Sequence, residues 1–218
     1  MISRPVERPT RVRSHANGAK PRRNDLPRDL TDQAIRSALR THVLKLHSRA
    51  RKSVLLEEVG LCRGLARMDV VVVNGRLHGY EIKSDRDSLR RLPAQVKAFG
   101  KVFDRLTLVV GDRHRARAGK TLPRWWGIIQ VTSTPTGPHF RVVRRPEDNP
   151  RRDPRALVEL LWADDARALL EARGAARGVR AKPRRFLWDR IVQQLELSEI
   201  AFAVRGRLKA RGAQPARQ

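Results

Sequence analysis

The stretch Arg67–Asp85, RMDVVVVNGRLHGYEIKSD, predicts the centre of the fold. Residues 69–73 form a valine-rich run that is too short for an ordinary helix, so we expect a buried strand. Asn74-Gly75 is a dipeptide typical of tight turns, because both residues tolerate positive φ. Residues 77–83 then return as a second strand, so the stretch as a whole predicts a β-hairpin.

The hairpin carries three ionisable side chains, Asp69, Glu81 and Lys83, on largely apolar strands. Side chains alternate along a strand, so Glu81 and Lys83 lie on one face and Ile82 on the other. A two-residue connection would put Asp69 on the face opposite Glu81, whereas a three-residue connection or a bulge would put both acids on one face. Because buried charges are costly unless they are paired or bind a metal, we predict the odd-length connection and a shared site.

Two carboxylates and a lysine on adjacent strands suit metal-assisted hydrolysis of phosphodiester bonds. Carboxylate oxygens bind hard divalent cations, which offset phosphate charge and lower the pKa of a water. The sequence therefore predicts Asp69 and Glu81 as ligands for Mg²⁺ or Mn²⁺, and Lys83 as the group that positions or activates the attacking water. The alternative is a structural hairpin in which Glu81 and Lys83 form a solvated ion pair on an edge strand.

At these residues the sequence resembles the PD-(D/E)XK nuclease superfamily, whose motif is an Asp, a short gap and Glu-x-Lys. Asp69, Glu81 and Lys83 match that motif, while Met68 replaces the proline that usually precedes the Asp. The segments EEVGLCRGLARMD, GYEIKSDRDSLRRL, QVKAFGKVFD and WWGI also look like a small uncharacterised bacterial family within that superfamily. The resemblance implies an α/β fold with a restriction-endonuclease-like core, in which helices flank a mixed central β-sheet.

The resemblance also implies further site residues. The carbonyl of Ile82 would complete the metal site with the two acids. In similar families a glutamate before an aliphatic residue and a turn adds an acidic group, which here favours Glu58 over Glu57. Gln95 and Phe99 resemble the Q-xxx-Y element of RecB-like nucleases, where the glutamine supports the active site, although phenylalanine lacks the tyrosine hydroxyl. An ordinary polar position on a helix is the alternative for Gln95.

The chain of 218 residues carries 48 Lys and Arg against 22 Asp and Glu, a net charge of +26. Such a surplus favours nucleic acid, DNA first, bound through salt-sensitive phosphate contacts. The arginine bias of a GC-rich genome is an alternative origin for part of the charge. The one cysteine, Cys62, excludes an internal disulfide and fits a cytoplasmic location. No apolar run is long enough to cross a bilayer, so we expect no membrane partner, and the oligomeric state stays open with a homodimer as one option.

The sequence predicts four parts. Residues 1–28 are basic and nearly without large apolar side chains, which indicates a disordered arm that either grips phosphates or is a solvated tail. Residues 29–145 form the nuclease-like core, which opens with a helix capped by Thr31. Residues 146–154 are polar and proline-bearing, as is typical of a linker. Residues 155–212 predict an all-helical C-terminal subdomain.

Other local signals place helix boundaries along the chain. Ser84 to Asp87 predicts the start of a helix with acids in its first turn, and Pro93 restarts that helix as a new first-turn residue. Apolar residues at helical spacing predict one amphipathic stretch over residues 156–170. Ser198 is predicted to cap the last helix.

Arginines are the predicted nucleic-acid contacts, namely Arg67, Arg184, Arg185, Arg205 and Arg207. Arg67 could instead neutralise the carboxylates beside it. The C-terminal helices are also compatible with a helix-turn-helix module or a plain bundle with an arginine-rich solvent face. The predicted function is a metal-dependent DNA endonuclease in defence, repair or recombination. The alternatives are a non-enzymatic basic DNA-binding protein with a helix-turn-helix-like C-terminal region, and an inactive scaffold for protein partners.

Overall fold

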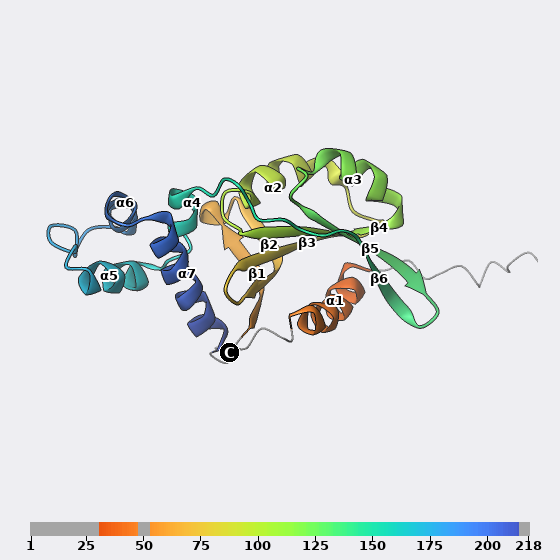
Figure 1. Ribbon diagram of the computed structural model, residues 1–218, viewed down its shortest axis with the longest axis horizontal. Helices are drawn as coiled ribbons and strands as arrows, with labels where there is room; N and C mark the ends of the chain where they lie inside the picture. The colour runs from red at the N-terminus through yellow and green to blue at the C-terminus, as the bar shows by residue number, and fades with distance from the viewer. Residues whose placement is uncertain (1–30, 48–52, 214–218) are drawn as a thin grey trace, which may run out of the picture.

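The structure is a computed structural model that describes residues 31–47 and 53–213. The predicted basic arm, residues 1–28, lies outside the described residues. The first two thirds of the chain contain both helices and strands, and the last third contains helices alone (Figure 1). The predicted α/β class is therefore confirmed. Among the described helices, none has the length and apolar character needed to cross a membrane.

A six-stranded mixed β-sheet forms the centre of the molecule. Its strands lie side by side in chain order, with parallel pairs β3–β4 and β4–β5 in the middle and antiparallel pairs toward both edges. The predicted mixed central sheet is confirmed. The strands are β1 Val54–Leu61, β2 Ala66–Val73, β3 Leu77–Lys83, β4 Arg105–Gly111, β5 Gly127–Thr134 and β6 Gly137–Arg144.

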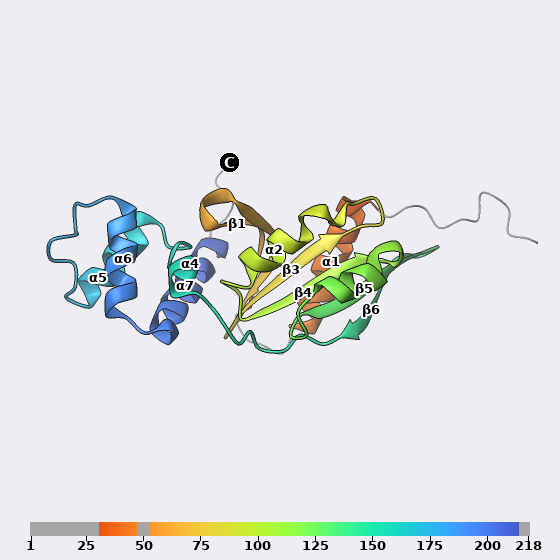
Figure 2. The same ribbon diagram turned by 90° about the horizontal axis from the view of Figure 1, so that it is seen from above.

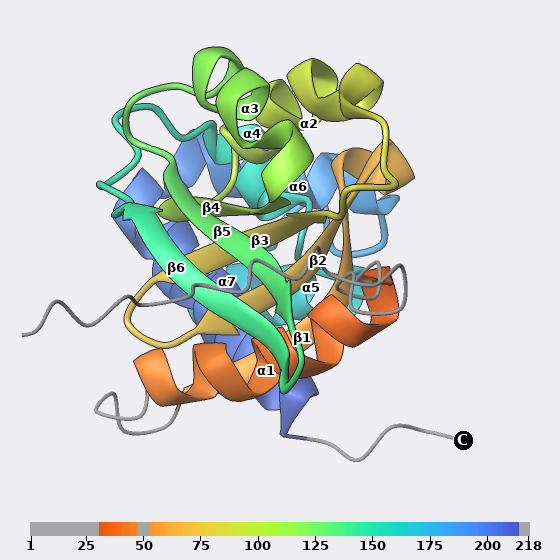
Figure 3. The same cartoon turned by 90° about the vertical axis from the view of Figure 1, so that its right-hand side faces the viewer.

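Helices cover both faces of the sheet (Figure 3). On one face lies α1 (Asp32–Leu46), whose buried Ile35, Leu39 and Val43 belong to one apolar cluster with strand residues. On the other face lie α2 (Leu92–Phe99) and α3 (Arg115–Thr121), which contribute to a second and larger cluster. Because side chains alternate along β2, that strand supplies valines to both clusters.

The predicted helix starts have mixed outcomes. Thr31 is the N-cap of α1, as predicted, and its hydroxyl oxygen accepts a hydrogen bond from the main chain of the first turn. The prediction of a helix start at Ser84 is wrong, because its main-chain N–H and its hydroxyl both donate to Oδ2 of Asp87 over 2.6 Å and close a turn instead. A short 3-10 turn at Leu89–Arg91 leads into α2, where Pro93 lies in the first turn, as predicted.

The C-terminal helices gather at one end of the sheet (Figures 1 and 2). The prediction of one amphipathic helix over residues 156–170 is wrong, because the chain turns between α4 and α5. The prediction that Ser198 caps the last helix is also wrong. Glu196 is the cap, and it exchanges hydrogen bonds with Glu199 in a capping box, so Ser198 already lies inside the helix. The helices are α4 Pro154–Val158, α5 Ala163–Ala172, α6 Arg184–Gln194 and α7 Leu197–Gly212.

The helices and the sheet share one apolar cluster, so they pack as a joined unit. At the end of α7, Gly212 approaches β1 so closely that a Cβ on it would lie 2.3 Å from Cγ1 of Val54. The segment between β6 and α4 is also hydrogen-bonded to the rest of the protein. The main-chain N–H of Asn149 donates to the carbonyl of Asp104 over 2.8 Å.

Candidate functional site

The hairpin brings the two predicted acids into one cleft, just beyond the last paired residues of its strands. The connection between β2 and β3 is the three-residue segment Asn74–Arg76, so the predicted odd length is confirmed. At the other end of the hairpin the last paired residues are Val70 and Tyr80. The next residues along the two strands, Asp69 and Glu81, follow directly after this last pair, and both line one cleft.

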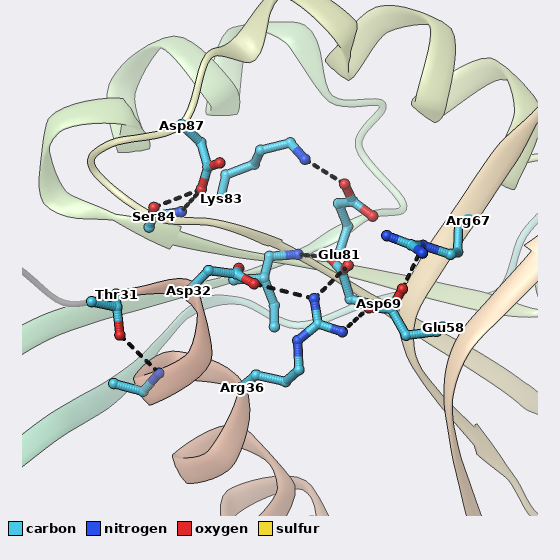
Figure 4. Close-up of polar contacts among 12 residues, drawn as sticks. Thr31, Asp32, Arg36, Glu58, Arg67, Asp69, Glu81, Lys83, Ser84 and Asp87 are labelled. Atoms are coloured by element: carbon cyan, nitrogen blue, oxygen red, sulfur yellow. Dashed lines mark hydrogen bonds and ion pairs between the residues drawn. The ribbon is translucent and has the colours of Figure 1, made fainter.

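The carboxylate of Asp69 is fixed where the two strands separate. Its Oδ2 accepts a 2.7 Å hydrogen bond from the main-chain N–H of Ile82 (Figure 4). The side chain thus replaces a main-chain acceptor at the position where the β2–β3 ladder has ended. The Asp69 side chain is 16% exposed, which leaves it partly accessible from solvent.

Glu81 is the most deeply buried acid of the site, with a side chain 2% exposed. Its Oε1 accepts hydrogen bonds from Nζ of Lys83 and from Nε2 of Gln95, each over 2.5 Å. Its Oε2 is buried and has no hydrogen-bond partner among the described residues. Gln95 was predicted to support the site, and the structure places its amide directly on Glu81.

Burial dominates the electrostatics of both acids. It raises the pKa of Glu81 to about 7, and the nearby charge of Asp69 adds to the rise. The ammonium group of Lys83 and the amide of Gln95 oppose that rise. Burial also raises the pKa of Asp69, against the hydrogen bond from the Ile82 N–H. Both acids therefore favour an additional positive charge beside them.

Arg36 is a site residue that the sequence analysis missed. Its guanidinium reaches from α1 to three carboxylates (Figure 4). One terminal nitrogen lies 3.1 Å from Oδ1 of Asp69 and 3.2 Å from Oδ2 of Asp32, and the other contacts Glu58. Arg67 also contacts Glu58, over 2.5 Å, so it neutralises a carboxylate. In the sequence, Arg36 could be paired only with Asp32, which lies one helical turn earlier. That spacing gave no indication of the contacts with Glu58 and Asp69 on the strands.

Glu58, rather than Glu57, faces the Asp69 region. Glu57 pairs across 3.3 Å with Arg40 of α1, away from the acids of the hairpin. Glu58 has a φ of 56°, a left-handed conformation that is uncommon outside glycine. It does not line the cleft that holds Asp69, so its contact with that site runs through Arg36.

An open cleft of about 820 Å³ contains the site, and we call it the acidic cleft. Asp69, Glu81 and Lys83 line it together with Gln95 and Ile82. Exposed cationic side chains also line it, namely Arg67, Arg91, Lys97 and Lys101. The cleft thus combines buried carboxylates with an outer cationic lining.

The donor set is compatible with a hard divalent cation. Both acids offer oxygen, the donor that Mg²⁺ and Mn²⁺ prefer, and Oε2 of Glu81 is buried without a partner among the described residues. The carbonyl of Ile82 would be a third oxygen donor in the same cleft. In residues 31–47 and 53–213, no three His, Cys, Asp or Glu side chains gather to hold a metal by themselves. The set therefore requires main-chain or water oxygens to complete a coordination shell.

The four predicted C-terminal arginines all contact other side chains of the protein. Arg184 and Arg185 each lie with the guanidinium 4.7 Å from the centre of an aromatic ring. Arg205 lies 3.9 Å from Asp104, and Arg207 lies 3.6 Å from another aspartate. None of the four lines the acidic cleft. Their role toward nucleic acid stays a prediction.

The comparisons with known proteins identify the family. The sequence family described as Bacteriophage P4 protein cII matches residues 27–217. The chain belongs to this family. A curated relative, Protein cII of Enterobacteria phage P4, is 28% identical over 93 residues, which are 43% of this chain and 35% of that protein. The match thus spans about a third of the relative's length.

Membership in the P4 cII family corrects the earlier assignment. The prediction of a PD-(D/E)XK superfamily member is wrong, because the match to the P4 cII family covers nearly the whole chain. The descriptions nuclease and endonuclease that came with that assignment are corrected with it, since neither match carries them. No solved structure matches this P4 cII family chain. The strand pairing of the structure itself establishes an α/β architecture with a mixed sheet.

Proposed function

We propose that this P4 cII family protein binds nucleic acid, DNA first, in the acidic cleft and hydrolyses a phosphodiester bond there with Mg²⁺ or Mn²⁺. The observation that carries the proposal is that Asp69, Glu81 and Lys83 line one cleft, with Lys83 hydrogen-bonded to Glu81. The two carboxylates would bind the cation, and the Lys83 ammonium carries protons beside them in the same open cleft.

Each residue has a distinct part in the proposed reaction. A divalent cation supplies positive charge that offsets the phosphate and lowers the pKa of a water. Asp69 and Glu81 hold the cation with the Ile82 carbonyl, and Gln95 keeps the Glu81 carboxylate in place. Lys83 positions the attacking water, because its ammonium donates hydrogen bonds beside the acids.

The outer lining of the cleft supports an anionic polymer as the substrate. Arg91, Lys97 and Lys101 are exposed, and we find no acidic partner for them within the described residues. Cations without partners are available to phosphates, and each phosphate contact adds to the salt dependence of binding. The net charge of +26 acts in the same direction.

The test compares three variants that keep side-chain shape. Asp69→Asn and Glu81→Gln each remove a negative charge from the cation site, so both should abolish cleavage and weaken the binding of Mn²⁺. Lys83→Met should retain Mn²⁺ binding and slow cleavage on the order of a hundredfold or more. Glu57→Gln is the matched control, since Glu57 pairs with Arg40 and lies outside the cleft. Substrates should include duplex, single-stranded and branched DNA, and RNA.

A second candidate is a non-enzymatic DNA-binding protein. The contact of Arg36 with Asp69 favours it, because a carboxylate that is already neutralised has less need of a cation. This function predicts no cleavage by the wild type, no stabilisation by Mn²⁺, and equal DNA affinity for all three variants. That pattern would exclude hydrolysis.

A further inference from the structure

The position of Arg36 is unusual because one guanidinium serves acids from three elements. Asp32 lies on the same helix, Glu58 on β1 and Asp69 on β2. The Arg36 side chain is 21% exposed, so most of it is enclosed by these neighbours. An arginine surrounded in this way is held by its acidic partners rather than by solvent.

Arg36 donates to the part of Asp69 that a cation would need. The Ile82 N–H already holds Oδ2, and the Arg36 guanidinium lies 3.1 Å from Oδ1. A divalent cation on Asp69 would therefore stand next to the positive charge of Arg36. The two cations repel each other, and the repulsion is strong in a partly buried site.

Arg36 also has partners to retain if it leaves Asp69. Its contacts with Asp32 and Glu58 do not involve Asp69, and Asp32 is one helical turn away on the same helix. A small rotation of the side chain could then free Oδ1 without leaving the guanidinium unpaired. This makes an exchange of Arg36 for a metal ion physically accessible.

We propose that Arg36 is an internal counter-ion that competes with the divalent cation for Asp69 and thereby sets the metal affinity of the site. Without metal, Arg36 neutralises Asp69. When the cation binds, Arg36 withdraws to Asp32 and Glu58. The inference rests on the cation site of the proposed function and adds a means of regulating its occupancy.

The test measures Mn²⁺ binding by calorimetry in the full chain, with Arg36→Met and the matched control Arg40→Met. Arg40 lies one turn further along α1 and pairs with Glu57 over 3.3 Å, outside the acidic cleft. Arg36→Met should bind Mn²⁺ on the order of tenfold more tightly than the wild type, because the competitor is gone. Arg40→Met should match the wild type.

A second readout is the melting temperature with and without Mn²⁺. Arg36→Met should melt lower than the wild type without metal and gain more from added Mn²⁺. Arg36→Lys keeps one charge but cannot span three acids, so it should show intermediate Mn²⁺ affinity and serves if the Met variant does not fold.

The outcomes separate this inference from the proposed function. Mn²⁺ binding by the wild type with equal or weaker binding by both Arg36 variants overturns the competition and leaves the cation site intact. Absence of Mn²⁺ binding in the wild type and in every variant overturns the cation site and the competition together.

Discussion

Gln95 donates its side-chain amide to Oε1 of Glu81 over 2.5 Å, and this contact joins helix α2 to strand β3. Lys83 donates to the same oxygen, so both donors hold one side of the carboxylate. The opposite oxygen, Oε2, is buried without a partner among the described residues. The helix thus orients the acid rather than merely covering it.

Removing this contact should destabilise the protein. Gln95→Leu retains much of the volume but removes a donor from a buried carboxylate, so we expect a loss of about 1–3 kcal/mol in the free energy of unfolding. Urea unfolding measures it. Lys97→Ala, on the exposed side of the same helix, should change stability by less than about 0.5 kcal/mol. Equal stability of Gln95→Leu and wild type would contradict the role of the hydrogen bond.

A second prediction concerns the buried ring of His78. Nε2 of His78 lies 2.8 Å from Oγ1 of Thr107, and Nδ1 lies 3.3 Å from Oη of Tyr80. Burial, together with the charges of His47 and Arg105, lowers the pKa of His78 to about 3. The folded protein therefore keeps this ring neutral where the unfolded chain protonates it.

The contribution of His78 to stability should accordingly fall in mild acid. The unfolded chain binds the proton near pH 6.5 and the folded protein near pH 3, so His78 favours unfolding as the pH drops through that window. Glu81 acts in the opposite direction, because its raised pKa lets the folded protein bind a proton first. The His78 contribution has a slope of up to about 1.4 kcal/mol per pH unit. Urea unfolding between pH 4 and 7 measures it. His78→Gln should lose less stability than the wild type as the pH falls, or gain more, whereas His139→Gln, at an exposed position, should follow the wild-type profile.

A third prediction concerns Asp104, which joins the sheet to the C-terminal part. Its Oδ2 accepts a 2.7 Å hydrogen bond from the Leu77 N–H, and its carboxylate pairs with Arg152. Asp104→Ala leaves both partners unsatisfied in a site where the acid is 12% exposed, so we expect a loss of about 2–4 kcal/mol. Thermal and urea unfolding measure it. Asp148→Ala removes an exposed acid and should cost less than about 1 kcal/mol.

A fourth prediction concerns the length of the hairpin connection. Deleting Gly75 leaves two residues between the strands and shifts the β2–β3 register by one residue, so the variant should lose cooperative unfolding. Inserting two glycines keeps the connection odd and should cost only about 1 kcal/mol or less of loop entropy. Circular dichroism during thermal unfolding distinguishes them. A deletion variant as stable as the insertion variant would show that the register is not constrained by the acids.

The hairpin could be predicted because its information is local. Side chains alternate along strands, so an odd-length connection was predicted from the acids, and the pairing of Val73 with Leu77 confirms that length. Gln95 was predicted from the resemblance to the Q-xxx-Y element, and its contact with Glu81 agrees with the supporting role that the resemblance implied. The same local logic failed at Ser198, where a glutamate two residues earlier formed a better cap.

Contacts between distant segments could not be predicted. Arg36 meets Asp69 and Glu58 only because α1 packs beside the end of the sheet, and no spacing in the sequence encodes that placement. The positive φ of Glu58 could not be predicted either, because glutamate rarely adopts a left-handed conformation. Arg205 looked like a surface cation for the same reason, because its partner Asp104 lies far away in the sequence.

The absence of a side chain at Gly212 lets the end of α7 approach the start of β1. A Cβ there would lie within 2.3 Å of Val54 and 2.6 Å of Leu56, so the last turn of α7 rests directly on β1. The same strand carries Glu58, a partner of Arg36. A substitution at Gly212 is therefore expected to displace β1 and with it the Glu58 carboxylate that contacts Arg36. The end of α7 is for this reason a poor place to attach a fusion partner.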